Sequence, residues 1–177
     1  GASESNSMII SRVCDSYLLT GKTPHLVVSA IEHKSVIECV NYNVGIGRAT
    51  ATFVDPVSSG HILPEHIASA INDRTALVCV MHANNEIGTV NDIKRIGAIA
   101  HSKNIPFFTD AVQSFGKYGM KPLANNVDGF SVSFHKLYGP VGCGLLVIRR
   151  EWVDGFKLKS LIFGSQNSGL RGGTENI

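Results

Sequence analysis

The sequence predicts an α/β fold in which helices flank a mostly parallel, mixed sheet. Short apolar runs alternate with helical patterns along the chain, and no internal repeat or linker divides it. Such alternation favours parallel strands whose two faces are covered by helices. Of the 177 residues, 44% are hydrophobic and 17% are charged, which is enough apolar material for one ample core. We therefore expect a single domain over residues 1–177.

The predicted strands are short apolar runs bounded by turn residues, as is typical of buried strands. They cover residues 26–31, 50–54, 76–81, 106–109, 130–133 and 144–148. The predicted helices are segments in which apolar residues recur every three or four positions. They cover residues 5–18, 34–40, 64–71 and 92–100.

The composition argues against several classes of protein. The net charge is +2 and the basic residues are scattered without aromatic interleaving, so we expect no nucleic-acid partner. The chain has no long apolar run, and we expect no membrane partner. Its four cysteines form neither a CxxC pair nor a cluster of metal ligands, which favours free thiols and no metal. Gly45-Ile46-Gly47 lacks the third glycine of a dinucleotide fingerprint and is interpreted as a loop.

The most informative segment is Ser133-Phe134-His135-Lys136-Leu137-Tyr138-Gly139-Pro140. A predicted strand precedes it, and Gly139-Pro140 prevents a helix from continuing past the lysine. A lysine amine forms a Schiff base with an aldehyde when its site disfavours the protonated form. Ser133 and His135 are suited to bind a phosphate. The combination suggests pyridoxal phosphate, and the structural alternative is a solvated surface lysine.

Asp110 is the second candidate, because it follows the short apolar strand 106–109. An acid at the carboxyl end of a strand in an open α/β sheet lies where ligands bind. There a carboxylate would keep the ring nitrogen of pyridoxal phosphate protonated, so that the ring withdraws electrons. The structural alternative is that Asp110 caps the next helix.

Six motifs follow one another along the chain: Gly1-Ala2-Ser3-Glu4-Ser5-Asn6, Glu32-His33-Lys34, Asn84-Asn85-Glu86-Ile87-Gly88, Asp110-Ala111-Val112-Gln113-Ser114, the segment 133–140, and Arg171-Gly172-Gly173-Thr174-Glu175-Asn176. In this order they resemble the large domain of the class V aminotransferase group, and most closely its cysteine desulfurases and selenocysteine lyases. The resemblance runs nearly from end to end and implies a fold-type I domain that binds pyridoxal phosphate.

The resemblance implies roles for the residues around the cofactor ring. Lys136 would carry the cofactor as an internal aldimine, and Asp110 would pair with the ring nitrogen. His33 would stack on the ring and move protons, work that suits an imidazole. Asn85 would bond the phenolic oxygen or the substrate carboxylate, and Gln113 would also donate to the phenolic oxygen. An ordinary surface histidine at a helix start is the structural alternative for His33.

The resemblance also implies a phosphate site at the start of the chain. Ala2 and Ser3 open the first predicted helix, where N–H groups lack partners and the helix dipole favours an anion. They would hold the phosphate together with Ser133 and His135. Ser3 replaces the family's usual threonine but keeps its hydroxyl, and an ordinary N-cap serine is the alternative.

The last motif implies a homodimer, because the family's corresponding threonine, here Thr174, reaches the phosphate of the partner subunit's cofactor. Arg171 is a candidate for the substrate carboxylate, whose geometry a guanidinium matches, although a solvated charge is the alternative. The residues before this motif depart from the family's glycine-rich run and read Phe163-Gly164-Ser165-Gln166-Asn167.

The implied activity is removal of sulfur or selenium from cysteine or selenocysteine to give alanine, with a possible sulfur-acceptor protein and a role in sulfur metabolism or iron–sulfur cluster assembly. The alternatives are another class V lyase or aminotransferase, or a truncated, non-catalytic dimerisation partner. The chain opens inside the first motif, and the family's nucleophilic cysteine belongs to a part beyond Ile177. We therefore expect truncation at both ends, which leaves cytoplasmic and organellar locations equally open.

Overall fold

The computed structural model describes residues 1–122 and 124–174 and contains one six-stranded sheet of order β2-β1-β3-β4-β5-β6. Five strands run parallel to their neighbours, and the last strand is antiparallel to β5. The predicted mostly parallel, mixed sheet is therefore confirmed. The strands are β1 (His25–Ser29), β2 (Thr50–Val54), β3 (Thr75–Cys79), β4 (Phe107–Asp110), β5 (Gly129–Ser133) and β6 (Gly144–Ile148).

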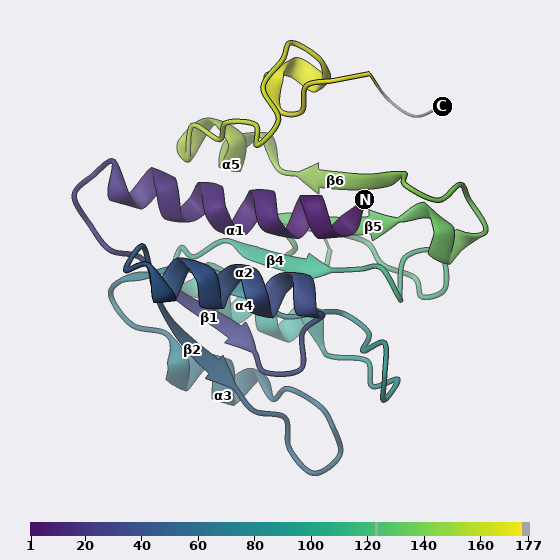
Figure 1. Ribbon diagram of the computed structural model, residues 1–177. Coiled ribbons are helices and arrows are strands. Elements are labelled where there is room, and N and C mark those ends of the chain that lie inside the picture. The colour runs from purple at the N-terminus through teal and green to yellow at the C-terminus, as the bar shows by residue number, and fades with distance from the viewer. Residues whose placement is uncertain (123, 175–177) are drawn as a thin grey trace.

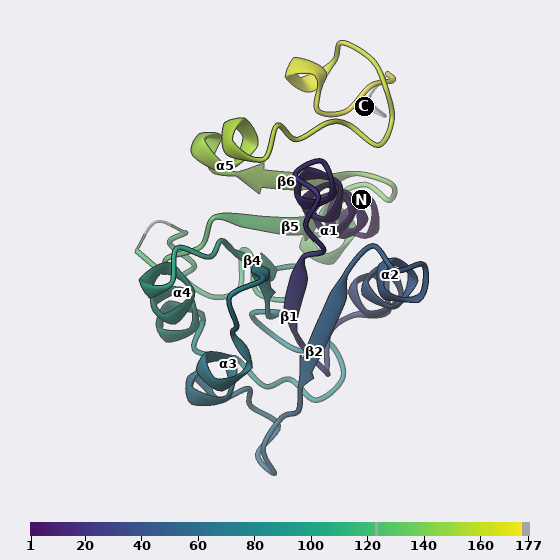
Figure 2. The same ribbon diagram turned by 90° about the vertical axis from the view of Figure 1, so that its left-hand side faces the viewer.

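Helices cover both faces of the sheet, as Figures 1 and 2 show. Side chains of one strand point alternately to the two faces. Leu26 and Val28 therefore pack with the first pair of helices, whereas Val27 packs with the second pair. The first pair is α1 (Ala2–Leu18) and α2 (Lys34–Gly45), the second pair is α3 (Pro64–Ala70) and α4 (Ile93–Ser102), and α5 (Arg150–Gly155) follows β6.

The predicted elements are present, and the differences lie at their ends. α1 begins at Ala2 rather than near Ser5, because Gly1 is its N-cap. α2 continues to Gly45, since the buried Val40 and Asn43 extend its inner face beyond the predicted end. α5 was not predicted, because Trp152 is its one buried residue, and a single buried residue produces no apolar periodicity in the sequence. None of the helices in the described residues is both long and apolar enough to cross a membrane.

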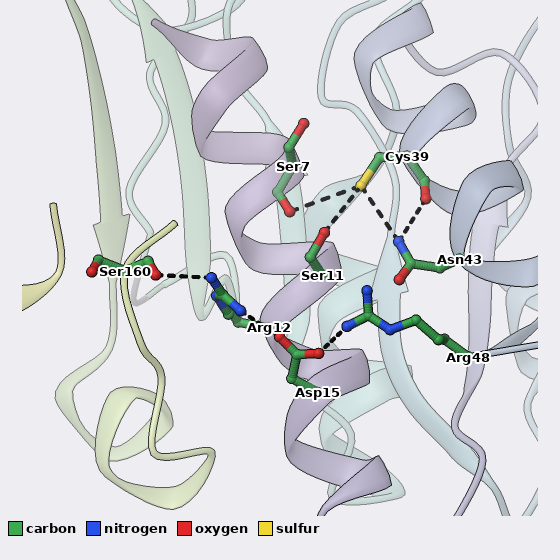
Figure 3. A network of polar contacts seen from close by, with 8 residues as sticks. All are labelled: Ser7, Ser11, Arg12, Asp15, Cys39, Asn43, Arg48 and Ser160. Carbon is green, nitrogen blue, oxygen red and sulfur yellow. Dashed lines mark hydrogen bonds and ion pairs between the residues drawn. The ribbon is translucent and has the colours of Figure 1, made fainter. Parts of the chain in front are cut away.

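A polar network ties the middle of α1 to segments on both of its sides (Figure 3). Asp15 pairs with Arg12 on its own helix and with Arg48, which follows α2. Arg12 also donates to the carbonyl oxygen of Ser160 at 2.8 Å. α1 is therefore connected to α2 and to the segment that follows α5.

The segment after α5 runs back along α1 toward the helix N-terminus. Phe156 lies against Tyr17 near the end of α1, with ring centroids 6.1 Å apart. Arg171 pairs with Glu4 in the first turn of α1, with 3.0 Å between Nε and Oε1. The Arg12 contact lies between these two, so the segment is antiparallel to the helix.

None of the four cysteines forms a disulfide in the described part of the chain, in agreement with the thiols that the sequence predicted. Burial raises the pKa of Cys14 to about 11 and that of Cys79 well above its ordinary value. Burial also raises the pKa of Cys39, whose sulfur lies 3.6 Å from the Ser11 hydroxyl between α1 and α2 (Figure 3). These three thiols therefore stay protonated and act as packing groups.

Gly97 in α4 leaves no room for a side chain, since a Cβ there would lie 2.5 Å from the carbonyl oxygen of Asn126. We expect Gly97→Ala to destabilise the chain by about 1–3 kcal/mol, because α4 must move away from that loop. Gly45 is the matched control, because a Cβ on it would meet open space. Gly45→Ala is expected to be neutral or to stabilise by up to about 1 kcal/mol. Urea unfolding measures both, and equal effects would contradict the packing argument.

Candidate active site

Neighbouring strands end at one edge of the sheet, and each delivers a predicted side chain there (Figure 1). His33 follows β1, Asn85 follows β3, Asp110 ends β4 and Ser133 ends β5. Residues far apart in the sequence thus become neighbours at the carboxyl ends of parallel strands. This edge is where open α/β sheets bind ligands.

A pocket of about 160 Å³ opens at this edge, and its walls include every predicted cofactor residue except Thr174. Ser35, Met81 and Val112 complete the lining. The predicted residues in the walls are Ala2, Ser3, His33, Asn85, Asp110, Gln113, Ser133, His135 and Lys136.

The first turn of α1 forms one wall of the pocket through Ala2 and Ser3. The Ala2 amide donates to the Ser133 hydroxyl at 3.3 Å, which joins the helix start to the end of β5. Gly144 permits this close approach, because a Cβ there would lie 2.6 Å from the Gly1 Cα. Helix-start amides and two serine hydroxyls together make a donor set suited to a phosphate.

Asp110 is buried, with 4% of its surface exposed, and both of its carboxylate oxygens accept hydrogen bonds. Val112 donates its amide to Oδ1 and Asn6 donates its side-chain amide to Oδ2, each at 2.9 Å. Burial raises the pKa of Asp110, whereas these two donors and the charge of His33 act in the opposite direction. The capping alternative is partly right, because Asp110 caps a turn rather than a helix.

A chain of hydrogen bonds joins Asp110 to His33 across two helices. The Asn6 amide that binds Asp110 also donates to the Ser35 hydroxyl at 3.0 Å. The Ser35 hydroxyl lies 2.8 Å from His33 Nδ1, and the Ser35 backbone amide donates to the same nitrogen at 3.1 Å. Nδ1 is therefore an acceptor, so the neutral imidazole carries its proton on Nε2. His33 is also the N-cap of α2, the helix-start position that its structural alternative expected, and its role at a cofactor ring stays a prediction.

Sequence reasoning missed Asn6, Ser35 and Asn84 as site residues. Asn6 is fully buried, and its position one turn after Ala2 on an otherwise apolar face was the available signal. Asn84 shapes the turn that carries Asn85. Its side-chain oxygen accepts from the amides of the two residues after Asn85, and its amide donates to the Ile31 carbonyl at 2.8 Å.

Lys136 lies on a single turn of 3₁₀ helix, Phe134–Leu137, directly after β5. The predicted stop is confirmed, but Tyr138 makes it by adopting φ 61°, one residue before Gly139. Gly139 then packs on Phe134, because a Cβ there would approach the Phe134 Cβ to 2.9 Å. The lysine is thus held at a chain reversal on the pocket rim.

Arg171 and Thr174 lie in a different pocket, of about 580 Å³, on the other side of the first turn of α1. Glu4, which pairs with Arg171, and Cys143 also line this second pocket. The structure therefore does not bring these two predicted residues into the pocket of Lys136. The motif's last residues, Glu175 and Asn176, lie outside the described residues.

The residues in the first pocket fit pyridoxal phosphate. Amide and hydroxyl donors at the start of α1 and the end of β5 suit its phosphate, and Lys136 offers an amine to its aldehyde. Asp110 offers a buried carboxylate to the ring nitrogen, and His33 lies in the same pocket. These are the chemical groups that this cofactor requires.

Comparison with known proteins agrees with this fit. The family model described as "Aminotransferase class-V" matches residues 1–177. The cysteine desulfurase IscS of Shewanella sp. (strain W3-18-1) is 40% identical over 98% of this chain. A structure described as "SspA in complex with cysteine" superposes with a TM-score of 0.92 at 41% identity, covering 99% of this chain and 49% of that one. A structure described as "NIFS-LIKE PROTEIN" superposes with a TM-score of 0.90 at 33% identity, covering 99% of this chain and 47% of that one.

The match covers nearly all of this chain but only part of its relatives. The chain spans 42% of the length of the Shewanella desulfurase. The family-model match over residues 1–177, the identity with desulfurases and the fold all agree. The chain therefore belongs to the class V aminotransferase family.

Proposed function

We propose that this chain is the large, cofactor-binding domain of a pyridoxal-phosphate-dependent cysteine desulfurase, which removes sulfur from cysteine and leaves alanine. The observation that carries the proposal is the pocket at the strand ends, where a lysine, a buried acid and an imidazole share one cavity with phosphate donors. The identity with cysteine desulfurases over 98% of the chain supports the same activity.

The residues of the pocket divide the work of binding and proton transfer. Lys136 holds the cofactor's aldehyde carbon, and Ala2, Ser3, Ser133 and His135 hold its phosphate. When bound, pyridoxal phosphate supplies an electron sink for the substrate's α-carbon.

Ring-side contacts complete the proposed site. Asp110 keeps the ring nitrogen protonated, and Gln113 donates to the phenolic oxygen. His33 stacks on the ring and moves a proton through Nε2, since Nδ1 is occupied by the Ser35 donors. Asn85 bonds the phenolic oxygen or the substrate carboxylate.

Cysteine is the proposed substrate, and a relative of similar fold has been described in complex with it. Arg171 is the proposed partner of its carboxylate once the Glu4 ion pair opens. The exposed Thr174 is proposed to reach the phosphate of a second copy in a homodimer. A sulfur-acceptor protein would receive the product sulfur, as a desulfurase requires.

We predict that the purified chain, freed of excess pyridoxal phosphate by gel filtration, keeps a visible absorption band that Lys136→Ala abolishes, because the pocket's phosphate donors hold the aldehyde next to this amine, whereas exposed amines bind it only loosely. Lys103→Ala is the matched control, since Lys103 is an exposed lysine at the C-terminal end of α4 and outside the pocket. This control is expected to keep the full band. A folded wild-type chain without a band, or an unchanged Lys136→Ala variant, would refute cofactor binding.

Substrate choice is tested by adding L-cysteine, L-selenocysteine or L-alanine to the loaded chain. A spectral change with cysteine and none with alanine supports the desulfurase, and this readout does not require the nucleophilic cysteine that the family carries beyond Ile177. A change with alanine alone favours another class V lyase or aminotransferase. A band without any substrate response, in a dimeric chain, favours the non-catalytic dimerisation partner.

Asp110→Asn is predicted to weaken binding of pyridoxal phosphate by roughly 30-fold or more, or about 2 kcal/mol, because a buried charge partner is removed. The variant should stay folded, since its new side-chain oxygen can still accept from the Val112 amide while Asn6 rotates its unpaired Oδ1 toward the new NH₂ group. Absorption titration measures the Kd, and circular dichroism checks the fold. An unchanged Kd would contradict the proposal that Asp110 pairs with the ring nitrogen of the cofactor.

A further inference from the structure

Glu32 is a second buried acid next to the candidate active site, with 8% of its surface exposed. It directly precedes His33, and the proposed function gives it no role. Its Oε1 accepts two hydrogen bonds, one from the Ser29 hydroxyl and one from the Met81 amide. Ser29 ends β1 and Met81 follows β3, so one carboxyl group joins the exits of two adjacent strands.

The two buried acids of this region, Asp110 and Glu32, differ in how many of their carboxyl oxygens accept hydrogen bonds. Asp110 receives a donor on each oxygen, whereas Glu32 Oε2 is buried without a hydrogen-bond partner among the described residues. A buried charge with an unpaired oxygen is costly. Because the two carboxyls repel each other when both are ionised, the site favours one proton between them, and that proton belongs on Glu32.

Burial and the charge of Asp110 both favour the protonated form of Glu32. Burial raises the pKa of Glu32 to about 8, and the charge of Asp110 adds to this effect against the Ser29 and Met81 donors. Cys79 of β3 is the neighbouring thiol, and burial together with the charges of Glu32 and Asp110 raises its pKa. Burial raises the pKa of Asp110 as well, but its two donors and the charge of His33 act against that rise, so the negative charge is better accommodated on Asp110, which has a donor on each oxygen.

We propose that Glu32 is a positioning residue that stays protonated at neutral pH, fixes the adjacent exits of β1 and β3 next to the pocket, and leaves Asp110 as the ionised acid of the site. Its protonation is a property of this chain alone. The further step, in which the neutral Glu32 leaves Asp110 ionised to pair with a cofactor ring, rests on the proposed function.

The test compares thermal unfolding of the chain without cofactor and its Glu32→Gln variant between pH 5 and pH 9. Glutamine keeps an acceptor for Ser29 and Met81 and imitates the neutral acid. The folded-state pKa of about 8 exceeds the ordinary 4.5, so the folded protein holds a proton that the unfolded chain releases between these values. The wild type therefore loses stability as pH rises through this window.

The expected result is a Tm difference, variant minus wild type, that rises by at least about 5 °C from pH 5 to pH 9. Glu38→Gln on the exposed face of α2 is the matched control, and its Tm difference should stay constant. A constant or falling difference for Glu32→Gln overturns the proposal, because Glu32 would then be ionised throughout.

Infrared spectroscopy of the wild type keeps the proposal testable if Glu32→Gln does not fold. A band of a protonated buried carboxyl is expected at pH 6, lost by pH 9, and retained at pH 6 in Asp110→Asn. Absence of the band at pH 6, or its loss in Asp110→Asn, overturns the proposal.

Cofactor titration separates this proposal from the proposed function. Glu32→Gln should bind pyridoxal phosphate at pH 7 within about twofold of the wild type, whereas Asp110→Asn should bind it weakly. A rising Tm difference in a chain that binds no cofactor would uphold the proton on Glu32 and reject the function. A large loss of binding in a folded Glu32→Gln variant would overturn the assignment of the charge to Asp110.

Discussion

Parallel pairing of β1, β3, β4 and β5 is the constraint on which the site depends. It sends four carboxyl ends to one edge of the sheet, and only short connections are then needed to gather a histidine, an amide, an acid and a lysine. The antiparallel β6 brings its amino end, not its carboxyl end, to this edge, where Gly144 pairs with Ser133. There β6 lies against the start of α1, and Gly144 allows backbone contact with Gly1. The chemistry is thus local to strand ends, whereas its geometry is set by the whole sheet.

α1 connects the separate parts of the molecule. Its first turn lies between the pocket of Lys136 and the pocket of Arg171, and its buried Asn6 links Asp110 to the start of α2. The Asp15 network then fixes the middle of the helix to its neighbours. A shift of α1 would therefore disturb phosphate donors, acid and imidazole together.

Much of the fold could be predicted because its strands are apolar runs and its helices show apolar periodicity. The pocket could be predicted because its motifs keep a family order, and all but one of the expected cofactor residues line it. Asn6 and Glu32 could not be assigned from sequence. The hydrogen bond between Asn6 and Asp110 joins residues far apart in the sequence and requires the first turns of α1 to lie next to the end of β4. The protonation of Glu32 depends on burial that only the folded sheet creates.

The segment after α5, which runs antiparallel to α1, contains more residues than its path along the helix requires. From Tyr17 to Glu4 the helix rises by about 20 Å, whereas the chain from Phe156 to Arg171 could extend to about 50 Å. The excess is taken up by a loop whose ends meet, since the Gly172 amide donates to the Ile162 carbonyl at 2.7 Å. Insertions and deletions within that loop can therefore change the shape of the second pocket while the contacts at Tyr17, Arg12 and Glu4 stay in place.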